Sequence, residues 1–392
     1  MFQPRHFYQH HFRNLEEFYL HNIIRLLALS MFDIFSSIYV FTLLRDVGLN
    51  HQQSLGLTAL FLAAIFLSHF TSLKIALYLI SKTSLQISMF WGNILLIFFS
   101  IILYFSRFNL YLLAPAAIIC GLYIAFYYTG YHIYFSQLTD DKRQGRELAI
   151  GNGLFAAVGI LGPILGGFII TLWGFGLLFL VMTIILVISS IPLKLIASKT
   201  VLKIDSVNLS PVFKFRKERG NLLAIFGSAA VDSCATYFWP LLIFIVLAGN
   251  FISVGILGAV IAGVSIGSSL GVGVLIDKLG PQKIIGSLSL GDSLVWIVRV
   301  FSQTPLLASL ASVLQALTTH NLSLTLDTMI YEKARAKGSI APIIQREVGF
   351  AISKTTFLAL SGFTFLLGAP LVFTFFAASV ATLLTKLYTP DY

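Results

Sequence analysis

The stretch GVLIDKLGPQKII, Gly273 to Ile285, is a short charged segment between two long apolar runs. Asp277 and Lys278 end the first run, Gly280 is a typical turn residue, and Lys283 already lies at the start of the next run. A connection this short cannot form a domain. Two long apolar helices are joined in this way where the surface of a bilayer ends both of them. The stretch therefore predicts a helical hairpin at a membrane surface.

The composition predicts that the whole chain lies in a membrane. Of its 392 residues, 57% are hydrophobic and 11% charged, whereas about 25% are charged in soluble domains. A helical span needs about 20 apolar residues. We therefore predict an all-α membrane protein with twelve transmembrane helices. The apolar runs lie near 22–44, 54–73, 84–104, 109–135, 147–171, 173–195, 221–248, 251–276, 283–302, 304–330, 343–364 and 366–386.

The basic residues predict the orientation of these helices. A net charge of +10 is compatible with nucleic-acid binding, but the Lys and Arg residues lie between apolar runs and form no patch interleaved with aromatic residues. Most of the 26 fall in alternate gaps, which the positive-inside rule assigns to the cytoplasm. We therefore expect no nucleic acid as a partner, both termini in the cytoplasm, and the cell membrane as the location.

The longest polar stretch, residues 196–220, is basic and divides the chain into two halves. We expect six-helix bundles at 21–195 and 221–387, with a cytoplasmic tail or interfacial segment at 1–20 and a C-terminal tail at 388–392. Because the linker is basic, we expect it to lie on anionic lipid. The first twenty residues lack the short apolar core and cleavage site of a signal peptide, so the first helix is expected to direct its own insertion.

A repeat links the two halves. Asp33 lies well inside the first run, and Asp232 lies at the same depth in the seventh, roughly 200 positions later. The dipeptide Arg-Glu at 146–147 recurs at 346–347, and residues 77–86 match the hairpin of the second half at nearly the same offset. Agreement among the three offsets indicates duplicated halves in parallel register.

The hairpin resembles the loop motif of the major facilitator superfamily. The resemblance implies two pseudo-symmetric six-helix bundles, a secondary transporter, and a role for the hairpin in cytoplasmic gating. Pro281 and Gln282 depart from the motif, which often has basic residues there. Asp327, at the inner end of the tenth run, is expected to pair with a lysine of the hairpin. The matching residues are Gly273, Leu275, Asp277, Lys278, Gly280 and Lys283.

The fifth run contains the sequence GILGPILGG. Glycines four residues apart allow a neighbouring helix to approach closely, and the proline bends the helix. The run resembles the helix-five motif of proton-coupled exporters of drugs and metabolites, so the resemblance implies efflux by antiport. A close helix crossing in any transporter or channel is the alternative explanation. The residues concerned are Gly159, Gly162, Pro163, Gly166 and Gly167.

Ionisable residues near mid-span are the candidates for chemistry, because a charge at the bilayer centre costs roughly 2.5–3.5 kcal/mol on insertion scales. The resemblance places Asp33, Asp232 and Lys354 around one central chamber. An aspartate that alternates between Lys354 and water could bind and release a proton, and a static ion pair is the alternative. Asp292 is expected to pair with Arg299, seven residues on, or with Lys354.

Aromatic residues indicate the substrate class. The fourth run has Tyr123, Tyr127, Tyr131 and Tyr134 on one helix face, and three consecutive aromatic residues of the seventh run, 237–239, follow Asp232 closely. Such walls suit amphipathic, aromatic or cationic compounds, although the same stripe is equally typical of packing. His132 of the fourth run and His320 of the tenth could titrate near neutral pH, and a hydrogen-bonded packing role is the alternative for each. The candidate substrate-site residues of these types are Tyr127, Tyr131, Tyr237, Trp239 and His320.

The sequence contains no metal-ligand cluster, nucleotide-binding loop or nucleophile triad, so we expect neither an enzyme nor a cofactor. Cys120 and Cys234 both lie in apolar runs and predict no disulfide. We predict a monomeric transporter that moves a small organic solute by alternating access, with protons as the coupling ion. The alternative is a non-transporting receptor or lipid-handling scaffold with the same fold.

Overall fold

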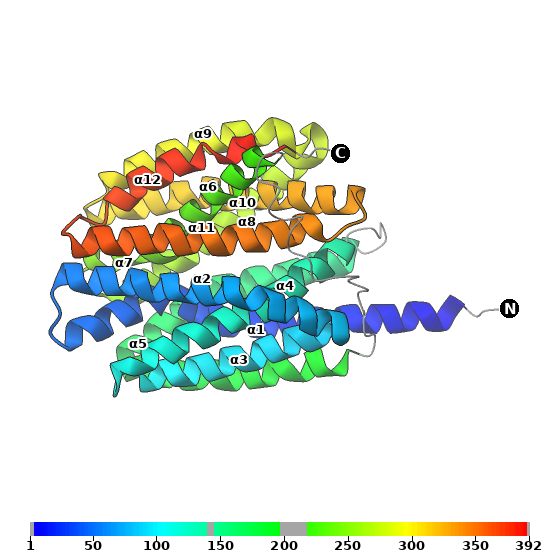
Figure 1. The fold of residues 1–392 in the computed structure, drawn as a ribbon, viewed down its shortest axis with the longest axis horizontal. Helices are drawn as coiled ribbons and strands as arrows, with labels where there is room; N and C mark the ends of the chain where they lie inside the picture. Colours follow the sequence, from blue (N-terminus) through cyan, green and yellow to red (C-terminus); the bar gives the residue numbers. More distant parts are fainter. Residues whose placement is uncertain (1–3, 139–144, 197–217, 390–392) are drawn as a thin grey trace.

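The computed structural model describes residues 4–138, 145–196 and 218–389, which are helical and contain no strand. The helices run side by side along the longest axis of the molecule (Figure 1). The elements are α1 (Pro4–Asp46), α2 (His51–Lys82), α3 (Leu85–Phe105), η1 (Leu110–Leu112), α4 (Leu113–Leu138), α5 (Gly145–Leu195), α6 (Arg219–Ser233), η3 (Cys234–Phe238), α7 (Trp239–Val246), α8 (Phe251–Leu279), α9 (Pro281–Val300), α10 (Pro305–Ala336), α11 (Ala341–Leu366), α12 (Phe373–Thr382) and η4 (Thr385–Leu387).

Among the described residues, eight segments are long and apolar enough to cross a membrane. The all-helical membrane architecture is therefore confirmed, while the count of twelve spans stays a prediction. The helices α9, α10 and α12 fall outside the eight. The helix α12 has only 10 residues, and α10 carries many hydroxyl and amide side chains.

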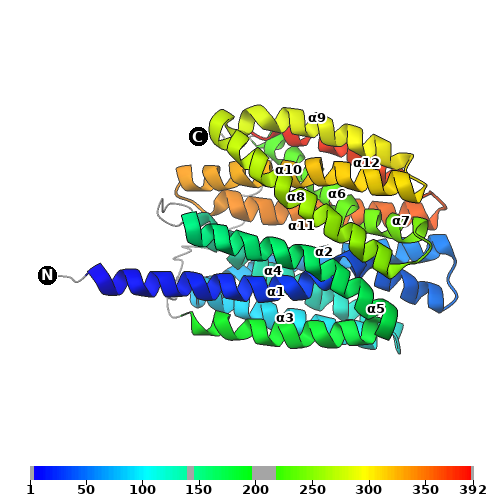
Figure 2. The same cartoon turned by 180° about the vertical axis from the view of Figure 1, so that it is seen from behind.

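The helix α5 joins two predicted spans across a break. Gly174 has φ 78° and ψ 175°, a conformation that side chains with a Cβ rarely adopt. The chain reverses direction there, as both ribbon views show (Figures 1 and 2). The break lies close to the predicted boundary between residues 171 and 173, so α5 holds two antiparallel helices.

A π-helical segment, η3, separates α6 from α7. Pro240 has no backbone N–H to donate to the preceding turn, and the helix widens over the five residues of η3 just before it. The predicted seventh run at 221–248 is therefore one apolar segment with an irregular centre. Asp232 lies immediately before this irregularity.

The helices form two groups that meet along two seams. In the first group α1 packs on α5, while α2 and α3 pack on α4. In the second group α6 packs on α11 and α12, while α8 and α9 pack on α10. The contacts of α2 with α11 and of α5 with α8 join the groups (Figure 1). Most of the predicted linker at 196–220 lies outside the described residues.

The N-terminal segment is helical. The helix α1 begins at Pro4 and continues without a break into the first span, so residues 4–20 belong to the same helix, and their place as a cytoplasmic or interfacial segment stays a prediction. Phe18 is buried and packs against the rings of Tyr131 and Tyr134. The start of α1 and the C-terminal end of the chain lie at one end of the molecule (Figure 2), which is called the terminal end below.

Glycines of α5 permit close contact with helices on both sides. A Cβ at Gly162 would collide with Ser30 of α1, and one at Gly166 would collide with the backbone of Met31. Gly167 meets the backbone of α8 in the same way. The close helix approach predicted from GILGPILGG is therefore confirmed, and it occurs at two crossings at once.

The crossing of α1 and α5 can be tested by adding one carbon atom. In Gly166→Ala the new Cβ meets the carbonyl oxygen of Met31 and the ring of Phe35, so the two helices must separate. We expect the free energy of unfolding to fall by about 1–3 kcal/mol, the usual cost of overpacking. The measurement is the apparent melting temperature in detergent. Gly159→Ala is the control, because no atom lies within 4 Å of its Cβ, and equal effects of the two variants would contradict this packing.

Candidate functional site

A cavity of about 360 Å³ lies between the two groups of helices. Its walls come from α1 to α5 on one side and from α6, η3 and α11 on the other. Most of the wall is apolar and aromatic. The ionisable residues that line it are Asp33, His69, Cys120, Tyr123, Tyr128, His132, Asp232, Tyr237, Arg346, Glu347 and Lys354.

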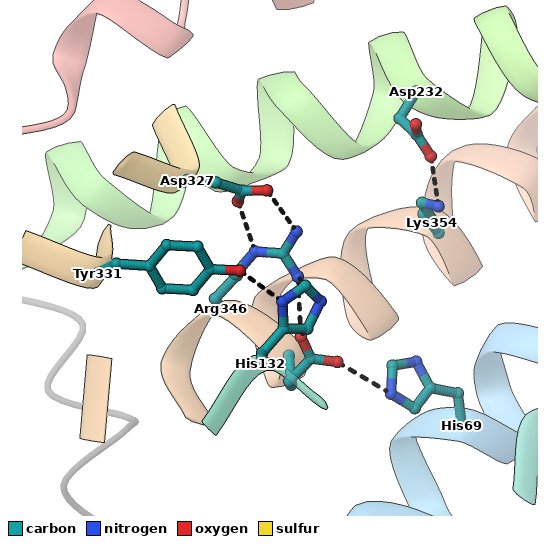
Figure 3. A network of polar contacts seen from close by, with 8 residues as sticks. His69, His132, Asp232, Asp327, Tyr331, Arg346 and Lys354 are labelled. Carbon is teal, nitrogen blue, oxygen red and sulfur yellow. Dashed lines mark hydrogen bonds and ion pairs between the residues drawn. The ribbon is translucent and has the colours of Figure 1, made fainter. Parts of the chain in front are cut away.

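An ion pair links α6 to α11 in this cavity. Nζ of Lys354 lies 2.5 Å from Oδ2 of Asp232, and also 4.5 Å from the ring centroid of Phe66 on α2. The Lys354 side chain is 11% exposed and that of Asp232 is 37% exposed. The ammonium group is therefore held inside the protein, while the carboxylate keeps access to the cavity. Figure 3 shows the pair beside a larger polar network.

Asp33 lines the same cavity from α1 and is exposed to it. Within the described part of the chain, its carboxylate forms no ion pair or side-chain hydrogen bond. Nearby, the hydroxyl of Ser37 donates to the backbone carbonyl of Tyr237 across the two groups of helices, at 2.9 Å. The structure thus brings Asp33, Asp232 and Lys354 together, as predicted, but leaves Asp33 as the carboxylate without a partner.

Several aromatic candidates lie elsewhere. Tyr127 is fully buried and hydrogen bonds Asn22 at 2.9 Å, and Tyr131 packs against its ring. Trp239 is buried and donates to Ser312 at 3.0 Å. These three residues do not line the cavity, because they face their own groups of helices. The prediction that these three residues line the cavity was therefore wrong.

His320, the polar candidate on α10, also lies away from the cavity. His320 is exposed on the outside of α10 and does not line the cavity. Among the predicted aromatic residues Tyr237 does line it, together with Tyr123 and Tyr128 of α4. Tyr123 belongs to the predicted four-residue series with Tyr127 and Tyr131, so that series reaches the cavity only at Tyr123, and Tyr128 comes from the neighbouring face of the helix.

A buried arginine stands behind these tyrosines. The guanidinium of Arg25 on α1 donates to the hydroxyl of Tyr123 and lies 3.6 Å from the ring centroid of Tyr127. The residue is 5% exposed. Its carbon chain and charge are accommodated by aromatic faces and a hydroxyl instead of a carboxylate. The signal for this residue was present in the sequence, since Arg25 is a charge within an apolar run.

A second polar network adjoins the cavity (Figure 3). Arg346 of α11 binds both carboxylate oxygens of Asp327 on α10, at 2.7 and 3.1 Å. It also donates to Glu347 at 2.8 Å. The prediction that Asp327 pairs with Lys278 or Lys283 was therefore wrong, because the planar guanidinium of Arg346 occupies both of its oxygens.

Two histidines from the first group of helices reach this network. Nδ1 of His132 on α4 hydrogen bonds the hydroxyl of Tyr331 at 2.6 Å, and Arg346 donates to its Nε2 at 3.3 Å. His69 on α2 has its Nε2 3.6 Å from a carboxylate oxygen of Glu347. The sequence did not single out His69 or Glu347 as site residues. Two features of the sequence could have identified them: both are polar residues within apolar runs, and Glu347 belongs to the repeated Arg-Glu dipeptide.

Asp292 and Arg299 are both fully buried on α9. Asp292 accepts hydrogen bonds from Trp296 at 3.0 Å and from the hydroxyls of Thr318 and Thr319 at 2.6 Å. The guanidinium of Arg299 lies between two indole rings, with its central carbon 4.1 Å from each. The predicted direct pair of Asp292 with Arg299 or Lys354 was therefore wrong. Donors within the second group satisfy the carboxylate.

The hairpin has the predicted geometry. Gly280 has φ 81°, which glycine adopts most readily, and Pro281 occupies the first turn of α9. Asp277, Lys278 and Lys283 are exposed and form no ion pair with another described residue. Gly273 has open space where a Cβ would lie. The turn is confirmed, and the gating role of the hairpin stays a prediction.

The described residues contain no group of three or more histidine, cysteine, aspartate or glutamate side chains that could hold a metal ion. The fold and site define a class: a helical membrane protein with an ionisable cavity between two helical groups. The sequence profile of the Major Facilitator Superfamily matches residues 23–345, and the chain belongs to that family. It is an integral membrane protein with the fold of secondary transporters. No curated protein sequence matches it.

Solved transporter structures share the fold along nearly the whole chain. A D-xylose-proton symporter is 12% identical, with a TM-score of 0.65, covering 93% of this chain and 97% of its own. A POT family transporter in complex with a thioalcohol conjugated peptide is 11% identical, with a TM-score of 0.71 and coverage of 96% and 95%. A peptide transporter POT in complex with sulfate is 13% identical, with a TM-score of 0.67 and coverage of 96% and 93%. At these identities the likeness establishes the fold alone.

The pair of Asp232 and Lys354 can be tested by a double-mutant cycle. Asp232→Asn leaves an ammonium group inside the protein without its partner, and Lys354→Gln leaves the carboxylate without its partner. We expect each to destabilise the protein, and the double variant to be less unstable than the sum predicts. The coupling energy should be about 0.5–3 kcal/mol, measured from unfolding in detergent. Strictly additive effects would contradict a direct interaction.

Proposed function

We propose that the protein is a proton-coupled secondary transporter that moves a small organic solute by alternating access. One observation carries the proposal: Asp33 presents a carboxylate without a partner to a cavity that also holds the Asp232–Lys354 ion pair. A membrane protein tolerates such a group where it meets water, a proton or a ligand. A carboxylate at this place is suited to carry a proton between the two sides.

The residues that line the cavity favour a restricted class of solute. Phe61, Phe66, Phe99 and Phe350 contribute aromatic wall, and Tyr123 adds a hydroxyl. Aromatic faces beside an unpaired carboxylate suit an amphipathic compound with a cationic group. Export is proposed on the helix-five resemblance alone. The sugar and peptide transporters of similar fold keep neutral and zwitterionic solutes among the compounds to test.

The membrane arrangement is part of the proposal. Twelve spans result if the two limbs of α5 count separately, α6, η3 and α7 form one span, and α9, α10 and α12 also cross. The predicted halves at 21–195 and 221–387 would then each hold six. The terminal end would face the cytoplasm, on the evidence of the basic residues. We propose a monomer in the cell membrane, with the exposed Asp277 hairpin acting at the cytoplasmic gate.

Transport is tested in proteoliposomes that contain a trapped pH-sensitive dye. The panel of candidate solutes added to the proteoliposomes consists of tetraphenylphosphonium, D-xylose, dialanine and 5-aminolevulinate. We expect addition of at least one compound to move protons with wild-type protein, and Asp33→Asn to reduce that movement to the level of protein-free liposomes. Asp46→Asn is the matched control, since it removes an exposed carboxylate from the same helix, outside the cavity. It should leave proton movement unchanged.

Two outcomes would contradict the proposal. Proton movement that survives in Asp33→Asn would remove this carboxylate from coupling. Panel compounds that raise the apparent melting temperature without any solute or proton flux would identify the protein as a receptor, because binding alone stabilises the folded state.

A further inference from the structure

Two charged residues are buried inside the second group of helices at positions where the first group has neutral ones. Asp292 and Arg299 of α9 are both 0% exposed. At the offset of 199 residues between the cavity aspartates of α1 and α6, the equivalent residues of α3 are Asn93 and Ser100. The fold therefore accepts an amide and a hydroxyl at these positions. Because burying a charge is costly, the two charges of α9 need an explanation beyond helix packing.

The neutral residues of α3 have partners on α5. Nδ2 of Asn93 donates to the hydroxyls of Ser189 and Ser190 at 3.0 and 2.8 Å. The hydroxyl of Ser100 forms a hydrogen bond with that of Thr183 at 2.9 Å. Uncharged hydrogen bonds are thus enough to hold α3 against α5 in the first group.

In the second group, Asp292 has donors for both of its oxygens. Oδ1 accepts from the hydroxyls of Thr318 and Thr319 on α10, each at 2.6 Å. Oδ2 accepts from Trp296 at 3.0 Å and from Thr382 on α12 at 3.3 Å. This carboxylate joins α9 to its two neighbours, as the amide of α3 does in the first group, and it needs no further partner.

Arg299 is the opposite case. Its guanidinium lies between the indole rings of Trp239 and Trp296, and none of its three nitrogens has a hydrogen-bond partner within the described residues. Asp292 and the C-terminal end of α9 both favour a positive charge at this place, but neither accepts a hydrogen bond from it. A guanidinium has five N–H donors, and leaving them without acceptors inside a protein is costly.

Gln315 of α10 adds a second polar group to this core. Ser312, Gln315 and Thr319 are spaced three and four residues apart and so share one helix face. Ser312 accepts from Trp239 at 3.0 Å and Thr319 donates to Asp292, so Gln315 lies between these two contacts along α10. Gln315 is 9% exposed, and its amide oxygen has no partner in the described part of the chain. The amide can turn to present its two N–H donors on this face.

We propose that Arg299 and Gln315 form a binding site for a small monovalent anion such as chloride, inside the second group of helices. Neither residue lines the central cavity, so the site is separate from it. An anion accepts from several N–H groups at once, and its hydrogen bonds with a guanidinium are strong. Water must also donate, and the nearby oxygens of Asp292 and Ser312 already have donors. Arg299 lies in the last turn of α9, so the ion reaches it from that end of the helix.

The site is tested by tryptophan fluorescence in detergent, with iodide as the probe. Of the four tryptophans, Trp91 and Trp173 are exposed and are replaced by phenylalanine, so the remaining signal comes from the two indole rings beside Arg299. Because Trp239 and Trp296 are buried, iodide in solution quenches them weakly, whereas iodide bound beside them quenches them strongly. Gluconate replaces the halide to keep the ionic strength constant.

We expect iodide to quench this fluorescence along a saturating curve. Chloride, which does not quench indole fluorescence, should raise the half-saturating iodide concentration severalfold. Chloride in place of gluconate should also raise the apparent melting temperature, since a ligand of the folded state stabilises it. Arg299→Met should abolish both responses. Asp292→Asn should lower the half-saturating iodide concentration severalfold, because it removes a negative charge seven residues away on the same face of α9.

Arg107→Met is the matched control. Arg107 also lies over two aromatic rings, those of Tyr104 and Phe108, but it is exposed just after α3. The control should keep both responses. If Arg299→Met does not fold, the double variant Asp292→Asn, Arg299→Ser provides a second route. It carries the residues that α3 has at the equivalent positions, so it should fold and should lose both responses.

Linear quenching that is equal in the parent and in Arg299→Met would overturn the inference and leave water as the partner of the guanidinium. Saturable quenching that persists in Arg299→Met would also overturn it, because the ion would then lie elsewhere. Equal melting temperatures of the parent in chloride and in gluconate would have the same meaning. The assay contains neither a transported solute nor a proton gradient, so its result is independent of the proposed transport function.

Discussion

The structure depends on the free-energy cost of an unpaired charge inside a bilayer. The chain meets this cost in three ways. Lys354 lies against Asp232, Arg346 binds two carboxylates, and Arg25 lies among tyrosine rings. Lys354 and Arg346 line the cavity between the two groups of helices. Arg25 instead lies within the first group, and Asp292 and Arg299 are buried within the second.

The two seams between the groups are formed by different kinds of contact. At the α5–α8 seam, Gly255 and Gly258 of α8 meet Pro163, and Gly167 meets the backbone of Phe251. Further along α8 toward the terminal end, a Cβ at Gly267 or Gly271 would meet no atom within 4 Å. The α2–α11 seam instead ends in His69 and Glu347. Both seams therefore have close glycine contacts at the end away from the termini, including those of Gly56 and Gly362 at the α2–α11 seam.

The sequence predicted the fold class and part of the cavity. Composition and apolar runs indicated a helical membrane protein, and the repeat placed Asp33 and Asp232 at equivalent depths that do meet one cavity. Helical spacing could not establish which tyrosines face it, since a rotation of the helix exchanges Tyr127 for Tyr128. Nor could it show that Asp327 binds Arg346 or that Asp292 is satisfied by threonines. Those choices depend on which helices become neighbours, and that information is absent from a single span.

The most direct test of the account measures distances between the two groups at both ends of the molecule. Spin labels at Val47 and Leu367, exposed at the end away from the termini, form one pair, and labels at Lys82 and Lys337, exposed near the terminal end, form the other. Both native cysteines are replaced by serine, and distance distributions are recorded at pH 8 and pH 6. The account predicts that the Lys82–Lys337 and Val47–Leu367 distances change in opposite directions between the two values of pH, because opening at one end closes the other. Two unchanged distances, or two that lengthen together, would contradict it.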